Sequence, residues 1–166
     1  IILSEKIDLM SRVAIDHMYS LASGFNISEK GPALITLAAH HDKRSIALSI
    51  NFLRSRNITL IKSALRAAEI LKEAELEDDV IKLLSSKIAI IRLQALESSF
   101  KLRLPKLENK LEGLLQDPAW YIRERLAKLI HTHDFATHLI PALLKDSSKS
   151  VRQIAQSGHK NHIQPA

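Results

Sequence analysis

The blocks Leu83–Arg92 (LLSSKIAIIR), Leu114–Arg123 (LLQDPAWYIR) and Leu143–Arg152 (LLKDSSKSVR) align without a gap. Each begins with Leu-Leu, has Ser or Asp two residues later, and ends in a β-branched residue followed by Arg. The blocks lie 31 and 29 residues apart, and a weaker copy, from Phe52-Leu53 to Ile61-Lys62, lies one period upstream. Self-similarity at a period of this size indicates a repeat architecture, so the blocks predict a stack of similar units.

The composition is that of an ordinary globular chain, with 46% apolar and 25% charged residues among 166. There is no cysteine, which excludes disulfides, thiolate zinc sites and thiol nucleophiles. No apolar run is long enough to span a membrane, and the first residues do not form a signal peptide. We therefore expect a soluble, cytoplasmic protein. Because the sequence starts at Ile1 without Met, we also expect a piece of a longer protein.

The net charge is +6, and the positive excess is confined to the second half of the chain. Residues 1–83 contain 11 basic and 11 acidic side chains, whereas residues 84–166 contain 13 basic and 7 acidic ones. This asymmetry predicts an anionic partner for the second half, either an acidic protein face or nucleic acid. The alternative is a mildly basic, solvated surface that serves solubility.

The spacing of apolar residues is helical throughout, and no stretch alternates as a strand would. It predicts about ten helices. The expected ranges are 4–22, 32–40, one that follows Asp42 and includes Leu53, 57–74, 77–85, 87–101, 105–115, 118–131, 135–145 and 147–157. Pro32 is expected in the first turn of its helix, and Asp117 and Asp146 are expected as caps. The short connections require antiparallel neighbours.

The helices group into hairpins within one domain. Residues 42–158 are predicted to hold four repeats, at 42–72, 74–101, 105–131 and 135–158, continuous with an irregular helical pair at 1–41. Residues 159–166 are expected to form a flexible tail. The predicted core stripes of the second helices are Ile91 with Ala95, Ile122 with Leu126, and Val151 with Ala155. Each hairpin alone leaves an apolar face open, so neighbours must stack.

The unit that begins at Leu139-Ile140-Pro141-Ala142-Leu143-Leu144-Lys145-Asp146 and continues at Val151-Arg152-Gln-Ile-Ala155 resembles a HEAT repeat. It is most similar to the short variety, about 30 residues long, of bacterial HEAT-like proteins and phycobilin-lyase-type repeats. Unit 74–101 departs from the pattern with Ser86 in place of Asp. Unit 42–72 departs further, with Arg56 in place of that Asp and Lys62 in place of the Arg. The resemblance implies an all-α solenoid, a right-handed superhelix of stacked antiparallel helix hairpins.

The resemblance also implies a role for the repeated Arg. In such repeats this residue commonly pairs with an Asp of the neighbouring unit, and a bidentate Arg suits a fixed carboxylate. We therefore interpret Arg92, Arg123 and Arg152 as a ladder that joins repeats rather than as ligand contacts. The family includes scaffolds, adaptors, nucleic-acid binders and a few enzymes, so the resemblance implies a fold more than a function.

One metal-like cluster is His131-Thr-His133-Asp134 with His138 close behind. Three imidazoles and a carboxylate could bind zinc, but this spacing lies across a turn between two helices, where nothing guarantees convergence. The alternative is a wet, polar loop. No cofactor is predicted.

A second candidate is His40-His41-Asp42, which is similar to the His-Asp pair of metal-dependent phosphohydrolases, with His17 as an upstream partner. The downstream Asp cannot be identified, because Asp78 and Asp79 lie in an acidic turn. The alternative is a helix exit followed by an Asp cap. The His-Glu pairs of HEAT-type deoxyhypusine hydroxylases are absent, which excludes that di-iron chemistry. There is also no Gly-rich phosphate loop, no Gly-x-Ser-x-Gly and no zinc-protease helix motif.

The aromatic and basic candidate surface is centred on Trp120-Tyr121, which holds the only Trp and one of two Tyr. Helical geometry places Tyr121 with two cations on a face away from the core stripe. The candidate binding residues are Trp120, Tyr121, Arg125, Lys128, Lys149 and Arg66. A rigid aromatic beside cations is typical of a protein hot spot or of a stacking surface for nucleic acid. Alternatively, Trp120 is wedged between stacked repeats.

These observations favour a non-catalytic HEAT-like scaffold that binds a protein partner with an acidic or mixed face, as a module of a larger protein. The alternative is nucleic-acid binding by the same basic face. HEAT-like alkylpurine DNA glycosylases, which place Trp, Asp and Arg in a basic concave groove, are its extreme form, although the matching Asp cannot be assigned here. A third hypothesis is an enzyme, either a lyase or a phosphohydrolase.

Overall fold

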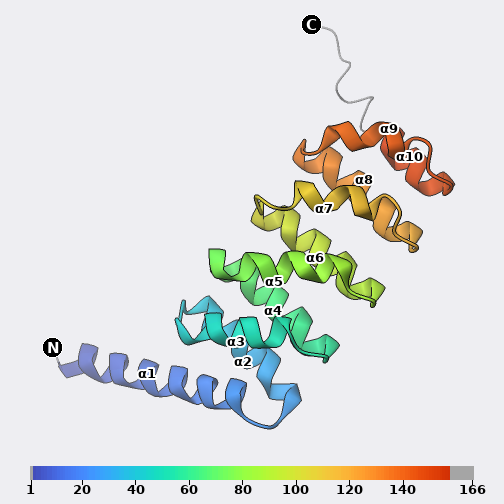
Figure 1. Cartoon of the computed structure of the whole chain (residues 1–166). Coiled ribbons are helices and arrows are strands. Elements are labelled where there is room, and N and C mark those ends of the chain that lie inside the picture. Colours follow the sequence, from blue (N-terminus) through green and yellow to red (C-terminus); the bar gives the residue numbers. More distant parts are fainter. Residues whose placement is uncertain (1, 158–166) are drawn as a thin grey trace, which may run out of the picture. The chain divides into compact units, whose positions relative to one another are not determined.

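The computed structural model describes the backbone of residues 2–157 and the side-chain surroundings of residues 11–157. These residues form ten α-helices and three short 3-10 helices, with no strand among them (Figure 1). The predicted all-α helical-repeat class, an α-solenoid, is confirmed. The predicted tail at 159–166, with His159 and His162, lies outside the described residues.

The chain divides into two compact units, unit 1 (Ile1–Val80) and unit 2 (Ile81–Ala166). Unit 1 contains α1 (Ile2–Ser23), α2 (Ile27–Ala39), α3 (Arg44–Leu53), α4 (Ile58–Leu71) and η1 (Ala74–Leu76). Helix α5 (Glu77–Lys82) spans the division. Within unit 1, α2 packs against α1, α3 and α4. Its core includes Ala22, Ala33 and Leu37, all almost fully buried.

Two asparagines start the inner helices of unit 1. The side chain of Asn26 accepts a hydrogen bond from the N–H of Ser28, and that of Asn57 accepts from Thr59 and Leu60. These bonds satisfy N–H groups that have no partner within the helix. The prediction that a helix starts at Pro32 is therefore wrong, because Asn26 begins α2 earlier and Pro32 lies inside the helix, exposed to solvent.

Gly31 permits close packing of α2 on α4. A Cβ atom at this position would overlap Ser63 Oγ and would lie 3.2 Å from Ser63 Cβ, which is a tight contact. The helices approach here because Gly31 has no side chain.

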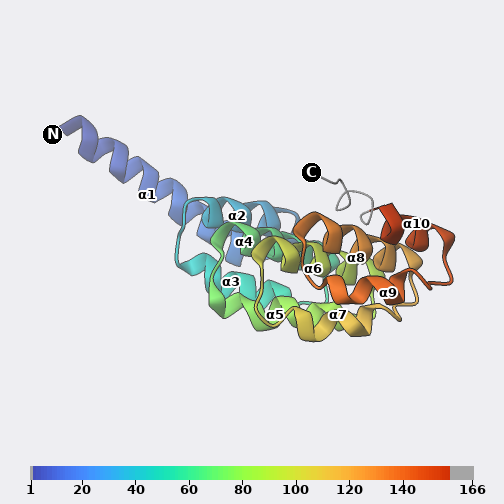
Figure 2. The same ribbon diagram turned by 90° about the horizontal axis from the view of Figure 1, so that it is seen from above.

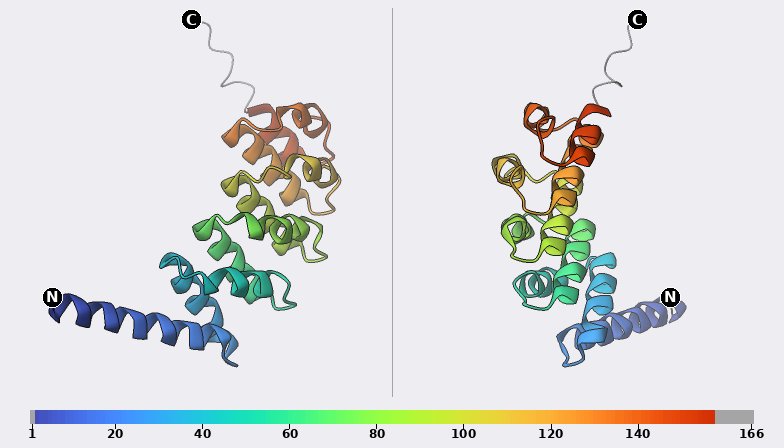
Figure 3. Two further views of the ribbon diagram at one scale, coloured as in Figure 1. Left: turned by 60° about the vertical axis from the view of Figure 1, so that its left-hand side comes forward. Right: turned by 90° about the vertical axis from the view of Figure 1, so that its right-hand side faces the viewer.

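Unit 2 contains two layers of helices, best seen in Figure 2 and in the right panel of Figure 3. One layer consists of α6 (Ala89–Leu102), α8 (Trp120–His133) and α10 (Lys149–Ser157). The other contains η2 (Leu83–Ser85), α7 (Glu108–Leu114), η3 (Thr137–Leu139) and α9 (Ile140–Leu143). Within the first layer, α8 packs against both α6 and α10.

The predicted core stripes of unit 2 are confirmed. All six of their side chains are fully buried, namely Ile91, Ala95, Ile122, Leu126, Val151 and Ala155. All six belong to one apolar cluster that also contains Leu107, Leu111 and Leu143 from the opposite layer. Stacking of neighbouring hairpins therefore buries the face that a single hairpin would expose.

A small polar side chain closes the turn before the second helix of each hairpin, that is before α4, α6, α8 and α10. Ser55 Oγ accepts from the N–H of Asn57, Ser86 Oγ from Ile88, and Asp117 and Asp146 from the residue two positions on. Ser55 therefore holds the turn position assigned from sequence to Arg56, and that assignment is wrong by one residue. The shift arises because Arg56 lies 30 residues before Ser86, whereas the starts of α4 and α6 lie 31 residues apart.

Candidate interaction surface

Two arginines of unit 2 join successive repeats. Arg92 donates from Nε and Nη2 to both carboxylate oxygens of Asp117 at 2.6 and 2.8 Å, and Arg123 does the same to Asp146 at 2.7 and 2.9 Å. The third donor of each arginine, Nη1, donates to the backbone carbonyl six residues earlier. Arg92 bonds the carbonyl of Ser86 in this way, and Arg123 bonds that of Asp117. The predicted ladder is present for these two arginines, and bidentate geometry makes such pairs specific.

The pairs keep their charges despite burial. Donation of hydrogen bonds to Asp117 raises the pKa of Arg92, and donation to Asp146 raises the pKa of Arg123. Burial opposes ionisation of Asp117, but the hydrogen bonds from Arg92 and from the Ala119 N–H outweigh it and lower its pKa. The hydrogen bond from Arg123 lowers the pKa of Asp146 in the same way. These residues are thus committed to structure rather than to a ligand.

Arg152 occupies the third ladder position but is paired differently. Its Nη1 donates to the backbone carbonyls of Asp146 at 2.5 Å and Ser147 at 2.9 Å. Within residues 11–157, no carboxylate contacts its Nε or Nη2. Arg152 therefore makes the backbone contact that the other two ladder arginines make to their own turn, and no ion pair with an aspartate is seen within the described residues.

Unit 1 contains a related ion pair that sequence inspection missed. Arg54 donates from Nε and Nη2 to both oxygens of Asp79 at 2.8 and 2.9 Å, and this bonding raises the pKa of Arg54. Asp79 is buried, whereas Arg54 is exposed. Arg54 follows α3 rather than beginning a second helix, so the repeated blocks gave no signal for the pair.

Trp120 and Tyr121 lie on the surface at the start of α8. Trp120 is 50% exposed and Tyr121 38% exposed, and their rings meet edge to face with centroids 6.0 Å apart. The structure thus distinguishes between the two sequence-based alternatives for Trp120: the ring rests on its neighbours but is not wedged between repeats. A half-exposed Trp beside a Tyr is the arrangement that protein hot spots favour.

Two isoleucines are exposed at the equivalent place on the neighbouring helix α6. Ile88 and Ile90, at the start of α6, are 39% and 42% exposed. Ile90 aligns with Tyr121 in the repeated blocks, and Tyr121 lies close enough to α6 to help raise the pKa of Arg92, after the larger effect of Asp117. We call Ile88, Ile90, Trp120 and Tyr121 the α6–α8 patch. Sequence analysis did not select the isoleucines. The signal that could have found them is the run Ile88-Ala-Ile-Ile, which has more apolar residues than one buried face of a helix can take up.

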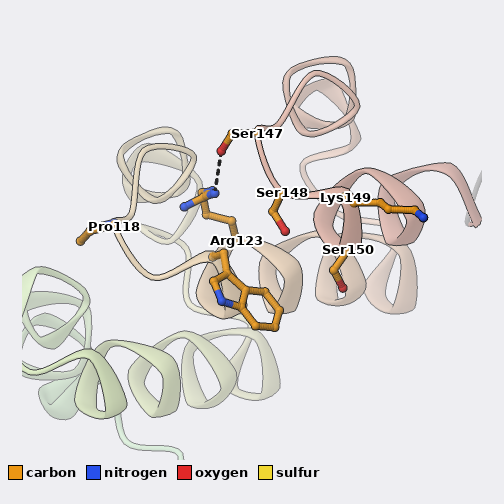
Figure 4. Close-up of a pocket in the computed structure, with 7 residues that line it drawn as sticks. Pro118, Arg123, Ser147, Ser148, Lys149 and Ser150 are labelled. Carbon is orange, nitrogen blue, oxygen red and sulfur yellow. Dashed lines mark hydrogen bonds between the residues drawn. The ribbon is translucent and has the colours of Figure 1, made fainter.

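A shallow depression lies beside Trp120 on the α10 side. It has a volume of about 520 Å³ and is lined by Pro118, Trp120, Arg123 and residues 147–150. Figure 4 shows the hydrogen bond from Arg123 to Ser147 at the edge of this depression, while the Lys149 side chain points away from Arg123. The depression links the α6–α8 patch to the first turn of α10.

The predicted cations of unit 2 differ in whether they have an ion-pair partner. Nε of Arg125 lies 2.7 Å from Glu97 Oε1, so its charge is partly neutralised by α6. Lys128 and Lys149 are exposed, and neither makes a side-chain ion pair within the described residues. Arg66 belongs to unit 1, where its Nη1 lies 3.0 Å from Glu69 Oε2. Arg125, Lys128 and Lys149 belong to unit 2 with the aromatic pair, whereas Arg66 belongs to unit 1.

The histidines proposed as weak metal ligands have separate partners. Nε2 of His131 lies 3.1 Å from the carbonyl oxygen of Ala155, and the His133 ring packs on Phe100 with centroids 5.4 Å apart. Nδ1 of His138 lies 3.7 Å from Glu108 Oε1. In the part of the chain that the structure describes, no three His, Cys, Asp or Glu side chains are placed to hold a metal ion.

The His40-His41-Asp42 sequence is a salt-bridged turn. Asp42 accepts from the backbone N–H and the guanidinium of Arg44, and the latter also bonds Asp16. The hydrogen bond from Arg44 lowers the pKa of Asp42. His40 and His41 are exposed. The arrangement matches the predicted helix exit and cap.

No described helix is both long and apolar enough to cross a membrane.

These features define a helical-repeat protein with a structural arginine ladder and an exposed aromatic patch. No protein-family model and no curated protein sequence matches the chain. Among solved structures, the fold is similar to the complex of CpcE and CpcF of phycocyanin lyase from Nostoc sp. PCC7120, with a TM-score of 0.64 and 16% identical residues. The alignment covers 91% of this chain and 65% of that one, so this chain spans less than two thirds of its length. The resemblance to phycobilin-lyase-type HEAT-like repeats is thereby confirmed at the level of fold.

Proposed function

We propose that this chain is a protein-interaction module that binds its partner through the α6–α8 patch. The observation that carries the proposal is the exposure of four large apolar side chains on the first turns of two neighbouring helices. Side chains at this place in a repeat have no role in the apolar core, yet they keep apolar surface in water. Such a grouping is typical of a surface that a partner covers.

The composition of the patch supports a protein partner. Trp and Tyr are the residues most enriched in binding hot spots, because each buries a large rigid surface and keeps a polar tip. Ile88 and Ile90 widen the apolar centre, while Lys128 and Lys149 supply a charged rim. An apolar centre with a polar rim is the usual anatomy of a protein interface. The partner face that fits is apolar at its centre and acidic at its margin.

The charges near the patch argue against nucleic acid as the principal ligand. Arg92 and Arg123 are committed to aspartates, and Arg125 lies against Glu97. A phosphate backbone requires several free cations in a row, since affinity comes from the counterions they displace. Beside the aromatic pair, Lys128 and Lys149 make no ion pair in the part of the chain that the structure describes.

The similarity in fold is consistent with this proposal, because the similar structure is a complex of two proteins, CpcE with CpcF. The exclusively scaffolding role, the acidic partner and the cytoplasmic location expected from sequence remain predictions. Lyase activity for this chain is not part of the proposal.

The proposal can be tested by site-specific photo-crosslinking. A photoreactive amino acid at position 121 in the native host should give a discrete protein adduct, and one at exposed Glu112 on α7 should not. The partner identified by mass spectrometry should bind the Trp120→Ala/Tyr121→Ala variant at least about tenfold more weakly, a change of ~1.4 kcal/mol. A Glu112→Ala control should bind within about twofold of the unmodified chain.

Nucleic-acid binding is the outcome that would replace this proposal. It would give crosslinks to RNA or DNA from position 121, together with an affinity that falls steeply with salt and depends little on sequence. Equal protein adducts from positions 121 and 112, or none from 121, would contradict binding at the patch.

A further inference from the structure

The first turns of α2 and α4 in unit 1 present a second group of exposed apolar side chains. Phe25, directly before the cap of α2, is fully exposed. Ile27 and Ile58, the first residues of α2 and α4, are 49% and 40% exposed. We call these three residues the α2–α4 patch. Short turns reverse the chain between α2 and α3 and again between α3 and α4, so α2 and α4 run in the same direction and bring their first turns together.

The place of these side chains in the repeat, rather than an open end of the stack, keeps them in water. Counted from the cap residue of each helix, Phe25 corresponds to Pro118 of unit 2, and Ile27 corresponds to Trp120. Helix α8 has a neighbouring helix on both sides, α6 and α10, yet Pro118 and Trp120 are exposed. Because stacking does not cover this place, the exposure of Phe25 and Ile27 does not depend on a missing neighbour.

Hydrogen bonds hold the turn that presents Phe25. The N–H of Gly24 donates to the carbonyl of Leu21 at 3.2 Å. Oδ1 of Asn26 accepts from the N–H and the hydroxyl of Ser28 at 3.1 and 2.7 Å. The phenyl ring is therefore carried by an ordered turn, and a partner that covers it does not have to order a loop first.

The charges around the α2–α4 patch are mainly positive, although residues 1–83 as a whole are balanced. Segments 25–30 and 54–62 together contain four basic side chains and one acidic side chain. One of the four, Arg54, is neutralised by Asp79.

Two of the other cations have no partner. Arg56 and Lys62 are exposed, and neither makes an ion pair within residues 11–157. Lys62 lies one turn after Ile58 on the same side of α4, so its charge borders the apolar patch. Carboxylates beside the apolar surface of a partner would complement these charges.

We propose that the α2–α4 patch docks a segment of a partner protein in which apolar side chains are flanked by Asp or Glu. The apolar side chains cover Phe25, Ile27 and Ile58, and the flanking carboxylates face Arg56 and Lys62. This surface goes beyond the proposed function, because it belongs to unit 1 and contains no residue of the α6–α8 patch. Two unpaired cations are few for a nucleic-acid backbone or an anionic membrane, since both ligands draw affinity from many charges.

The test follows the δ1 methyl signals of the isoleucines by NMR in the whole chain, with three synthetic peptides as probes. The acidic probe is acetyl-EEDLFDLLDEE-amide. The basic probe has Lys in place of every acidic residue, and the polar probe has Ser in place of Leu and Phe. The acidic probe should shift the signals of Ile27 and Ile58 in a saturable way, while that of Ile61, which is buried in α4, stays unchanged. The other two probes should bind at least about tenfold more weakly.

Three variants separate the apolar contribution from the charge. Phe25→Ala should weaken binding of the acidic probe about tenfold and leave the fold intact, because this side chain is fully exposed. Arg56→Glu/Lys62→Glu should weaken it by about the same factor, because like charges repel. The matched control Lys43→Glu/Lys72→Glu makes the same change of net charge just after the C-terminal ends of α2 and α4. It should bind within about twofold of the unmodified chain, since solvent screens distant charges.

Several results would overturn the inference. They are unchanged Ile27 and Ile58 signals, equal affinity for the acidic probe and either of the others, or equal losses in the two charge-reversed variants. Tighter binding of a thymidine decamer, or of vesicles of phosphatidylcholine and phosphatidylserine, at the same signals would replace the partner protein by nucleic acid or a membrane. Shifts confined to Ile88 and Ile90 would overturn this inference and leave the proposed function standing.

Discussion

Arg123 and Asp146 form a bidentate ion pair that joins α8 to the turn before α10 in unit 2. Nε and Nη2 of Arg123 bond both oxygens of Asp146, and Nη1 bonds the backbone of the turn that precedes its own helix. Asp146 in turn accepts the N–H of Ser148, which fixes the next turn. One guanidinium thus orients two successive turns, and the α6–α8 patch and the depression beside it lie next to these turns.

Removal of one partner of this pair should be costly. Arg123→Ala leaves the Asp146 carboxylate buried without its counter-charge, so we expect unit 2 to lose about 3–5 kcal/mol of unfolding free energy. The double variant Arg123→Leu/Asp146→Leu should recover most of the loss, because no charge is then left buried. Urea denaturation followed by circular dichroism measures both. A single variant that costs less than ~1 kcal/mol would contradict a structural role for the pair.

Arg54→Ala offers the matched comparison in unit 1. Arg54 forms the same bidentate contact with Asp79, but its side chain is 64% exposed. Because solvent screens an exposed guanidinium, the loss of unfolding free energy should be clearly smaller than for Arg123→Ala. Equal losses in the two variants would show that exposure does not set the strength of these pairs.

Stability should fall in acid through the same aspartates. The pKa values of Asp117 and Asp146 are lowered in the folded state, so their contribution is fully present above the unfolded pKa of about 3.9. It is lost as the pH falls through the lower, folded values. We expect the unfolding free energy of unit 2 to drop from pH 5 to pH 3, and Asp146→Asn to reduce that drop. Chemical denaturation at a series of pH values measures it, and equal stability at pH 5 and pH 3 would be inconsistent with this prediction.

Two glycines should respond oppositely to alanine. Gly113 in α7 has open space around it and no left-handed backbone, so Gly113→Ala should stabilise unit 2 by roughly 0.5–1 kcal/mol. Gly31→Ala would press its Cβ into Ser63, and it should destabilise unit 1 despite the gain in helix propensity. Thermal unfolding of the two variants gives the comparison. Stabilisation by Gly31→Ala would mean that α2 and α4 are not packed as closely as described.

Substitutions in the α6–α8 patch should leave the fold intact. Trp120→Ala/Tyr121→Ala removes half-exposed rings and should change the unfolding free energy by less than ~1 kcal/mol. Ile122→Ala, one residue further along α8, removes a fully buried side chain and should cost about 2–5 kcal/mol. Urea denaturation of the two variants gives their unfolding free energies, and the difference between them distinguishes surface residues from core residues. A large loss in the aromatic variant would indicate that Trp120 is part of the core.

Much of the fold could be predicted from the repeated blocks, because the residues that repeat are those that stacking requires. Ile91, Ile122 and Val151 recur since each fills the same place in the core. The start of α2 could not be found in this way, because Pro32 is a strong start signal and Asn26 is a weak one until its hydrogen bond to Ser28 is seen. Local signals of similar strength compete, and packing decides between them.

The candidate surface was only partly predictable for a related reason. Trp120 and Tyr121 stand out by residue type, whereas Ile88 and Ile90 have the residue type of core positions, and only the excess of apolar residues at this helix start sets them apart. Arg66 was grouped with the patch by helical position alone, but it belongs to unit 1. Arg54 and Asp79 were missed because their pairing joins positions that are not equivalent in the repeat.

The most direct test of the central claim, that a partner covers the α6–α8 patch, uses the fluorescence of Trp120, the single Trp of the chain. With a partner that lacks Trp, or one in which Trp is replaced, the emission should move to shorter wavelength on binding, and quenching by acrylamide should fall. The account predicts both changes at the concentrations that saturate binding. Saturated binding with unchanged emission and unchanged quenching would contradict it.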